Sequence, residues 1–227
     1  MKISRTQIPS LIDADVILGD VSALALLEST DVNGLLAAIL ETIECEKKDE
    51  LTIQDLFFFA ALQRIKANHI NSFQVKSKCD HPLIIVDRNG AQLALPSVLK
   101  IEEGDAVLTT SPCSTDLIIE LDISNLHVKH LDRSVLIDAE PEFRLPSAVD
   151  LFDGYVPEDR VAWIMLHLKP EFRSETYLGS KDSVWLAKLI KFVNDTDHGL
   201  INTLVCGCPS CGRISNVSWS INVDTFL

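Results

Sequence analysis

The C-terminal stretch Cys206-Gly-Cys-Pro-Ser-Cys-Gly212 decides how this chain is organised. Within it, Cys208-Pro-Ser-Cys211-Gly212 has the pattern of a metal-binding turn, because a C-x-x-C pair on a tight turn directs two thiolates at one point. Gly212 lets the chain leave such a turn in a left-handed backbone conformation. The alternative is a set of free thiols in a reducing compartment, where cysteine is often a small buried hydrophobe. The clustering of three of the six cysteines within six residues favours metal.

Two thiolates leave a structural zinc site half filled, because such a site takes four protein ligands in tetrahedral geometry. The other two ligands are expected to come from upstream cysteines. The predicted ligand set for one closed, structural zinc ion is Cys79, Cys113, Cys208 and Cys211. A site of this kind would tie the end of the chain to its middle.

Two alternatives to this ligand set stay open. His81 could replace Cys113, and Cys206 could replace Cys208, although the proline that follows Cys208 favours Cys208. Cys45 falls in a helical pattern and is not expected to bind the metal. The upstream cysteines also lack the two-residue spacing of the terminal pair, because a long insertion separates them.

The composition is that of a folded, acidic protein of 227 residues, of which 47% are hydrophobic. The formal net charge is -13, from 33 acidic and 20 basic residues, so nucleic acid, which requires a basic face, is not an expected partner. No apolar run approaches the roughly 20 residues of a membrane helix, and residues 1–9 lack a signal-peptide core. We therefore expect synthesis in a cytoplasm, where C-x-x-C indicates metal or redox chemistry rather than a disulfide.

The first half of the chain changes from helical to strand periodicity. Residues 1–70 are expected to form an N-terminal arm and helices, with Asp31 capping one helix and Thr52 and Asp55 forming a capping box before the next. Residues 71–150 alternate with a period of two and predict a central antiparallel β region that carries the first half of the metal site. Within it, Asn89-Gly90 marks the turn of a hairpin.

The second half repeats this order. In residues 151–199 the apolar residues have helical spacing, and we interpret this segment as a helical insertion. Its last helix is predicted to start at Asp182. Residues 200–227 are expected to form a β-ribbon with the metal knuckle at its tip. The predicted fold class is therefore α+β, with N-terminal helices, a central antiparallel β region, a helical insertion and a C-terminal zinc-ribbon-like β-hairpin.

The sequence contains no catalytic motif. We find neither a phosphate-binding glycine loop nor a G-x-S-x-G or H-E-x-x-H pattern. A redox C-x-x-C would sit between a strand and a helix, whereas strands are expected on both sides of Cys208 and Cys211. An all-cysteine ligand set is also typical of a closed zinc site without an open position. We expect a protein that is not an enzyme.

Three landmarks together resemble a known family. They are the stretch Leu51-Thr-Ile-Gln-Asp-Leu-Phe-Phe-Phe-Ala-Ala-Leu-Gln-Arg-Ile65, the stretch Ile119-Glu-Leu-Asp-Ile-Ser-Asn-Leu-His-Val128, and Cys208-Pro-Ser-Cys211-Gly212 in a short terminal ribbon. In this order the chain is similar, over residues 50–227, to the baseplate hub proteins of T-even-like contractile-tailed bacteriophages. In that family the middle strand pair carries its own close C-x-x-C, whereas Cys79 and Cys113 stand apart here.

The resemblance implies a structural or assembly component of a phage tail baseplate hub. Such a protein would be made in the host cytoplasm and located in the virion, and it would act without enzymatic activity in a multi-subunit assembly. Its partners would be other phage tail and baseplate proteins, not nucleic acid or membrane. Two alternatives remain open: a transient hub-assembly chaperone that is absent from the mature virion, and a zinc-ribbon module associated with nucleic acid or transcription.

Overall fold

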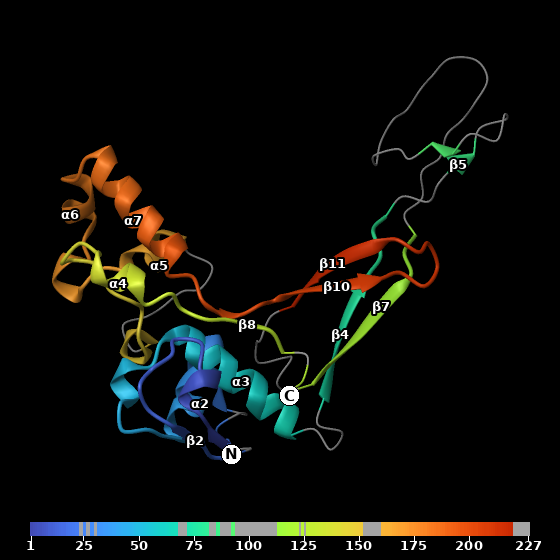
Figure 1. Ribbon diagram of the computed structural model, residues 1–227, viewed down its shortest axis with the longest axis horizontal. Helices are drawn as coiled ribbons and strands as arrows, with labels where there is room; N and C mark the ends of the chain where they lie inside the picture. The colour runs from blue at the N-terminus through green and yellow to red at the C-terminus, as the bar shows by residue number, and fades with distance from the viewer. Residues whose placement is uncertain are drawn as a thin grey trace. The chain divides into compact units, whose positions relative to one another are not determined.

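The computed structural model has helices combined with small antiparallel sheets, which confirms the α+β class (Figure 1). The chain divides into two compact units. Unit 1 comprises residues 1–71, 122–201 and 220–227, and unit 2 comprises residues 72–121 and 202–219. The structure describes residues 1–22, 25, 28–29, 31–67, 72–81, 85–86, 92–93, 113–122, 124, 126–151 and 160–219.

Unit 1 begins with a three-stranded antiparallel sheet of order β1-β2-β3. Its strands are β1 (Lys2–Ile3), β2 (Val16–Leu18) and β3 (Ile43–Glu44). The expected helix that would include Cys45 is shorter than predicted, because α2 spans Val32–Glu41 and Ile43 then pairs with Leu18. Pairing with β2 buries the side chain of Ile43, which is 3% exposed. This burial favours a strand at Ile43 over continuation of the helix. Cys45 therefore follows a strand and does not lie in a helix.

The core of unit 1 is built around α3 (Ile53–Ala67), whose apolar residues are buried on most sides of the helix. The N-terminus of α3 has the predicted capping box. The amide of Thr52 donates to Asp55 Oδ2 at 2.9 Å, and the amide of Asp55 donates to Thr52 Oγ1 at 3.2 Å. The predicted cap of α2 is also confirmed, since the Gly34 amide donates to Asp31 Oδ1 at 2.8 Å.

A second helical part of unit 1 lies in the second half of the chain. Its α-helices are α4 (Ser134–Ile137), α5 (Arg160–Leu166), α6 (Glu175–Gly179) and α7 (Ser183–Asp195), with 3₁₀ turns at Arg5–Gln7, Lys48–Glu50, Ala148–Leu151 and Pro170–Phe172 elsewhere in the unit. The predicted start of α7 is confirmed by a hydrogen bond from the Trp185 amide to Asp182 Oδ1 at 2.7 Å. Its buried side packs Leu189 and Phe192 against Phe143 and Leu168.

A buried ion cluster joins the segments of this helical part. Asp150 is fully buried and accepts hydrogen bonds from the guanidinium groups of Arg144 and Arg173, the latter at 2.6 Å. Its other carboxylate oxygen accepts from the amide of Ser147 at 2.7 Å. A buried carboxylate needs this number of donors because its desolvation is otherwise costly. The two strands that flank these helices in the chain pair with each other, since β8 (Val128–Lys129) precedes α4 and is antiparallel to β9 (Gly199–Leu200), which follows α7.

Unit 2 consists of short two-stranded sheets. One sheet contains β4 (Ser72–Lys78) and β7 (Asp116–Asp122), and another contains β10 (Thr203–Gly207) and β11 (Ile214–Ser218). The predicted hairpin pairing is confirmed, since β5 (Ile85–Val86) is antiparallel to β6 (Gln92–Leu93). The Asn89-Gly90 turn lies outside the described residues.

The pair β10–β11 has two chemically different faces because side chains alternate along a strand. Cys206 lies opposite Ser215 in the antiparallel register, and Leu204 lies opposite Val217. These four side chains are buried or half-buried, whereas the alternate residues are exposed. Leu117 and Ile119 of β7 pack in the same apolar cluster as Val217 and Cys206, so this cluster joins the two sheets of unit 2. Among the described residues, no helix is both long and apolar enough to cross a membrane.

Candidate metal centre

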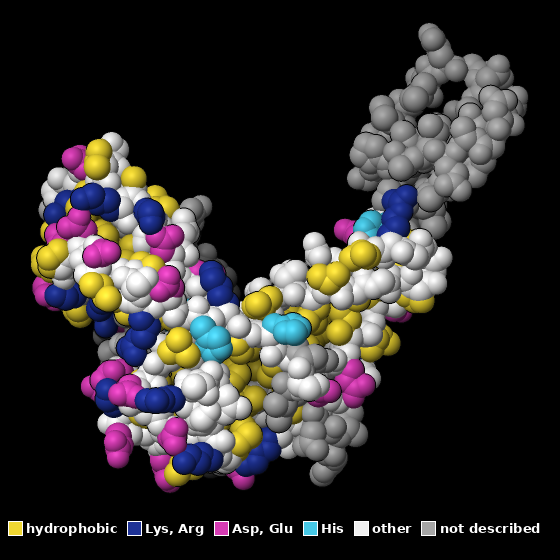
Figure 2. All heavy atoms as spheres, in the orientation of Figure 1, with side chains coloured by type: hydrophobic (Ala, Val, Ile, Leu, Met, Phe, Trp, Pro, Cys, Tyr) yellow, Lys and Arg dark blue, Asp and Glu magenta, His cyan; other side chains and the backbone are white. Residues whose placement is uncertain are grey.

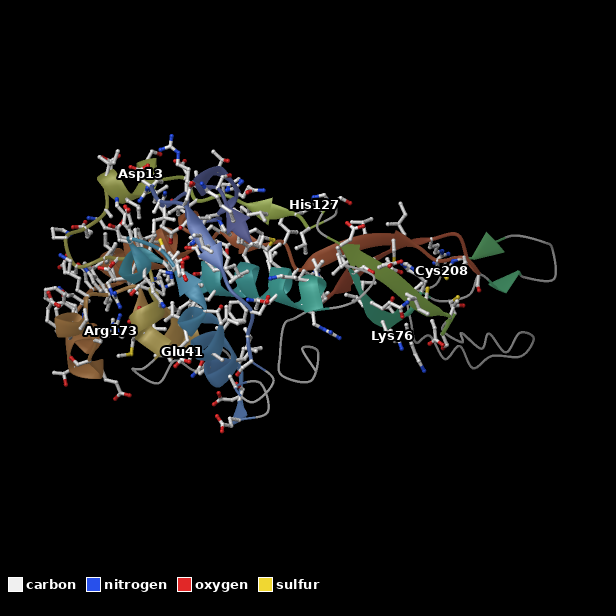
Figure 3. All side chains as sticks on the ribbon, turned by 90° about the horizontal axis from the view of Figure 1, so that it is seen from below. Asp13, Glu41, Lys76, His127, Arg173 and Cys208 are labelled. Atoms are coloured by element: carbon white, nitrogen blue, oxygen red, sulfur yellow. The ribbon has the colours of Figure 1, made fainter. Side chains whose placement is uncertain are left out.

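Four cysteines converge in unit 2 although they come from three separate places in the chain. The sulfur atoms of Cys79, Cys113, Cys208 and Cys211 all lie within 4.8 Å of one another. Cys79 Sγ is 3.7 Å from Cys211 Sγ, and Cys113 Sγ is 3.6 Å from Cys208 Sγ. Each of these contacts joins one upstream cysteine to one terminal cysteine. Figure 3 shows Cys208 just beyond the end of β10, where sulfur atoms gather.

The distances between these sulfur atoms fit a tetrahedral metal ion. A Zn–S bond of about 2.3 Å places the sulfur atoms of a regular tetrahedron about 3.8 Å apart. A disulfide would require about 2.05 Å, so the contacts of 3.6 and 3.7 Å are those of separate thiols. The four cysteines could therefore hold one metal ion.

The structure also bears on the alternative ligands. His81 and Cys206 do not belong to the convergent group. His81 Nδ1 lies 3.4 Å from Cys79 Sγ, which is a hydrogen-bonding distance from one ligand. It does not occupy one of the four ligand positions. Cys206 is half-buried and packs against the cluster of buried residues that contains Cys208, which lies two residues further along the chain. Cys45 lies in unit 1 and packs there against the main core.

The terminal cysteine loop, residues 208–213, is held by two backbone hydrogen bonds. The amide of Gly212 donates to the carbonyl of Cys208 at 2.9 Å, and the amide of Cys208 donates to the carbonyl of Arg213 at 2.8 Å. Gly212 has the expected left-handed conformation, with φ of 68°. The amides of Ser210 and Cys211 donate to Cys208 Sγ. The loop thus places its two thiols on one side. Two of its N–H groups point at the sulfur of Cys208.

The upstream cysteine loop, defined as residues 79–81 and 113–115, repeats this hydrogen-bond pattern. The amide of Ser114 donates to the carbonyl of Cys79 at 2.9 Å, and the amide of Cys79 donates to the carbonyl of Thr115 at 2.9 Å. Ser114 occupies the place of Gly212 and is also left-handed, with φ of 51°. The amide of His81 donates to Cys79 Sγ, as Ser210 does to Cys208.

Sequence spacing could not reveal this similarity between the two loops. The segment between Cys79 and Cys113 replaces the two residues that separate Cys208 from Cys211. In addition, the left-handed position of the upstream loop holds a serine, whereas a glycine would have indicated that conformation in the sequence. The one usable signal was the predicted hairpin between the two cysteines, because a hairpin brings its two ends together.

Burial and hydrogen bonding act differently on the first cysteine of each loop. Cys79 and Cys208 are 1% and 2% exposed. Burial raises the pKa of the Cys79 thiol to about 11, because the charged thiolate loses its hydration. The amides of Cys211 and Ser210, despite burial, lower the pKa of Cys208 to about 6 by donating to its sulfur. Cys208 therefore resembles a thiolate ready to bind a cation.

Hydroxyl and imidazole groups surround the cluster. Thr115 Oγ1 lies 3.1 Å from Cys113 Sγ, and Ser215 Oγ lies 3.3 Å from His81 Nδ1. A hydrogen bond to a ligand sulfur, as at Cys113, orients the ligand and stabilises its charged form. Within the described part of the chain, this is the only group of three or more possible ligands that converges.

A second pair of reactive residue types is too buried to act on a substrate. Thr52 Oγ1 lies 3.0 Å from His198 Nε2, and His198 Nδ1 donates to the carbonyl of Thr196 at 2.7 Å. That donor assigns the ring proton to Nδ1, so Nε2 accepts from the Thr52 hydroxyl. Thr52 and His198 are 2% and 5% exposed. The pair therefore joins the cap of α3 to the segment after α7 as a structural contact.

Comparison with family models, with curated proteins and with solved structures finds no match for this chain.

Proposed function

We propose that the protein is a structural or assembly component of a contractile phage tail baseplate hub, built around one structural zinc ion. The observation that carries the zinc site is the convergence of four cysteine sulfurs at distances suited to a tetrahedron. The assignment to a baseplate hub is supported by the resemblance of residues 50–227 to that family. The two cysteine loops would then form the two knuckles of a zinc ribbon.

A set of four thiolates closes the coordination of zinc and leaves no position for water or substrate. Such a site stabilises a fold and does not activate a nucleophile. The same set of ligands would also accept iron, since tetrahedral thiolate sites hold either metal. Elemental analysis therefore has to identify the ion as well as count it.

Unit 2 has the small core that a structural metal commonly supports. The buried members of its cluster are Cys79, Leu117, Cys208 and Val217, so two of the four are proposed ligands. Structural zinc contributes roughly 10 kcal/mol or more to the folding of small modules. We infer that the metal takes the place of a larger hydrophobic core in unit 2.

The outer face of β10–β11 favours protein partners over nucleic acid. Its exposed residues are uncharged, namely Thr203, Val205, Gly207, Ile214, Asn216 and Ser218. Val205 is 70% exposed and Ile214 is 68% exposed. Figure 2 shows mainly white and yellow surface over these strands, whereas dark blue and magenta groups are spread over the helices. Arg213 is the single charged residue in 200–223, so this strand pair lacks the basic groups that contact phosphates.

Two measurements test this proposal. Elemental analysis of the purified protein should find one zinc ion per chain, and a chelator that removes it should unfold unit 2 while α3 and its core remain folded. A mass-spectrometric inventory of mature phage particles should contain the chain. Its presence during assembly but absence from mature particles would instead identify a hub-assembly chaperone. Protein without bound metal after purification in the presence of zinc would contradict the metal site.

A further inference from the structure

The two cysteine loops differ at one hydrogen bond. In the terminal loop, Cys208 Sγ accepts from two amides, those of Ser210 and Cys211. In the upstream loop, the amide of His81 donates to Cys79 Sγ. The amide that corresponds to Cys211 is that of Cys113, and it donates instead to the carbonyl of His81 at 2.8 Å. In the upstream loop, the amide at this position is therefore hydrogen-bonded to a carbonyl and does not point at the sulfur of the first cysteine.

The side chain of His81 lies beside the sulfur of Cys79. Its Nδ1 atom is 3.4 Å from Cys79 Sγ, which is a usual length for a hydrogen bond to sulfur. A metal-bound thiolate has no proton and can only accept, so the contact requires that Nδ1 carry the ring proton. Cys79 is 1% exposed, so water has little access to its sulfur atom. A hydrogen bond from a protein group therefore stabilises this sulfur more than it would at an exposed position.

With the ring proton of His81 on Nδ1, the hydroxyl oxygen of Ser215 is a second acceptor beside that atom. Its hydroxyl lies 3.3 Å from His81 Nδ1, and the residue is 7% exposed on the inward face of β11. Ser215 also pairs with Cys206 across the β10–β11 sheet. The ring is therefore placed between a ligand of the upstream loop and the strand that follows the terminal loop.

We propose that His81 is a positioning residue of the metal site: its Nδ1–H group donates to Cys79 Sγ and replaces the amide that Cys113 directs elsewhere. This inference rests on the proposed metal site and adds that His81 acts through Cys79 and does not bind the ion. Loss of a hydrogen bond to a ligand typically lowers metal affinity by about 10- to 100-fold.

The test uses the full-length protein with His81→Ala and His81→Asn. Asparagine places its Nδ2–H group near the position of His81 Nδ1 and keeps the donor. Zinc affinity is measured by competition with a chromophoric chelator, and the ligand set is read from the charge-transfer absorption of the Co²⁺-substituted protein. We expect His81→Ala to weaken zinc by about 10- to 100-fold, with a four-thiolate spectrum whose charge-transfer band shifts, and His81→Asn to restore most of the affinity.

Controls separate this effect from a general loss of fold. His127→Ala removes an exposed histidine of unit 1 and should leave zinc affinity unchanged. Ser215→Ala should weaken zinc less than His81→Ala does, and it tests the ring orientation if His81→Ala does not fold. Wild-type affinity in a folded His81→Ala would overturn the inference, as would wild-type affinity in Ser215→Ala if His81→Ala does not fold, while the zinc site itself would stand. A three-thiolate Co²⁺ spectrum in the wild type would also overturn it, because His81 would then be a ligand. No metal binding by the wild type would remove the site and this inference together.

Discussion

Cys79 Sγ and Cys211 Sγ lie 3.7 Å apart although 132 residues separate them in the sequence. The contact joins the first cysteine of the upstream cysteine loop to the second cysteine of the terminal one. Both residues belong to unit 2, which is assembled from residues 72–121 and 202–219. Closure of so long a loop is entropically unfavourable, and a bound metal ion would offset that cost.

Serine at either terminal cysteine should abolish stoichiometric metal. We expect Cys208→Ser and Cys211→Ser to lose the ion, because a hydroxyl does not replace a thiolate in a tetrahedral zinc site. Cys45→Ser and Cys206→Ser should retain it, since neither sulfur belongs to the convergent group. Elemental analysis of the four purified variants provides the measurement. Full metal content in both terminal variants would show that the ligand set is wrong.

The left-handed residues of the two loops allow a matched test of backbone strain. Gly212 has φ of 68°, and an added Cβ would meet nothing within 4 Å. Gly212→Ala should therefore destabilise unit 2 by about 1 to 2 kcal/mol through backbone conformation alone. Ser114, with φ of 51°, should tolerate glycine with a change within about 1 kcal/mol.

Both variants are compared by chemical denaturation of the metal-loaded protein. Gly212→Asn serves as the control, because asparagine enters the left-handed region more easily than alanine. Equal stability of Gly212→Ala and the wild type would argue against a strained position.

The similarity of the two loops predicts that the upstream one can be shortened. Replacing residues 80–112 with Pro-Ser would give Cys79 the same spacing to Cys113 that Cys208 has to Cys211. We expect this variant to bind one metal ion at least as tightly as the wild type, because the Cys113 amide could again donate to Cys79 Sγ. Chelator competition measures the affinity. A shortened chain that folds in unit 1, by retained helical circular dichroism, but binds no metal would refute the equivalence of the loops.

Asp150 should be far more sensitive to substitution than an exposed ionic residue. Asp150→Asn removes the negative charge that faces Arg144 and Arg173, of which Arg173 is 12% exposed in its side chain. Breaking a buried ion pair of this kind costs about 3 to 5 kcal/mol. The control is Asp13→Asn, because the pair of Asp13 with Arg5 is 66% and 65% exposed and should change stability by at most about 1 kcal/mol. Similar midpoints of urea unfolding for both variants would contradict this difference.

His167 should make unit 1 less stable in mild acid. Burial lowers the pKa of His167 from 6.5 to about 4, with smaller contributions from His198 and Arg144, while the Trp163 carbonyl opposes the shift. Between these pH values the unfolded chain binds a proton that the folded chain does not. The stabilisation is therefore complete above pH 6.5 and is lost as the pH falls towards 4, by up to about 1.4 kcal/mol per pH unit.

Urea unfolding followed by helical circular dichroism between pH 4 and 7 measures this dependence. His167→Phe keeps an aromatic ring beside Trp163 and Phe192 and should flatten the profile. His130→Gln, at an exposed position, should leave it unchanged. An unchanged profile in His167→Phe would assign the acid sensitivity to other groups.

Local sequence was sufficient for the features that depend on neighbours in the chain. The caps at Asp31, Thr52 and Asp182 follow from side chains that each accept from an amide three residues further along the chain. The α+β class follows from the change of period between residues 53–67 and the strands after 72. The end of α2 was missed, because Ile43 pairs with Leu18 and no local signal announces that contact.

For the candidate metal centre, the sequence by itself determined the kind of ligand, since a C-x-x-C turn places two thiols together through local geometry alone. Only the tertiary structure decided which other residues complete the group, because Cys79 and Cys113 meet through backbone hydrogen bonds across a long insertion. It likewise placed His81 beside Cys79 instead of at a corner of the tetrahedron. The physical reason is that residue spacing determines only the contacts between residues that are close together in the chain. Contacts between residues far apart in the chain depend on how the strands of unit 2 pack.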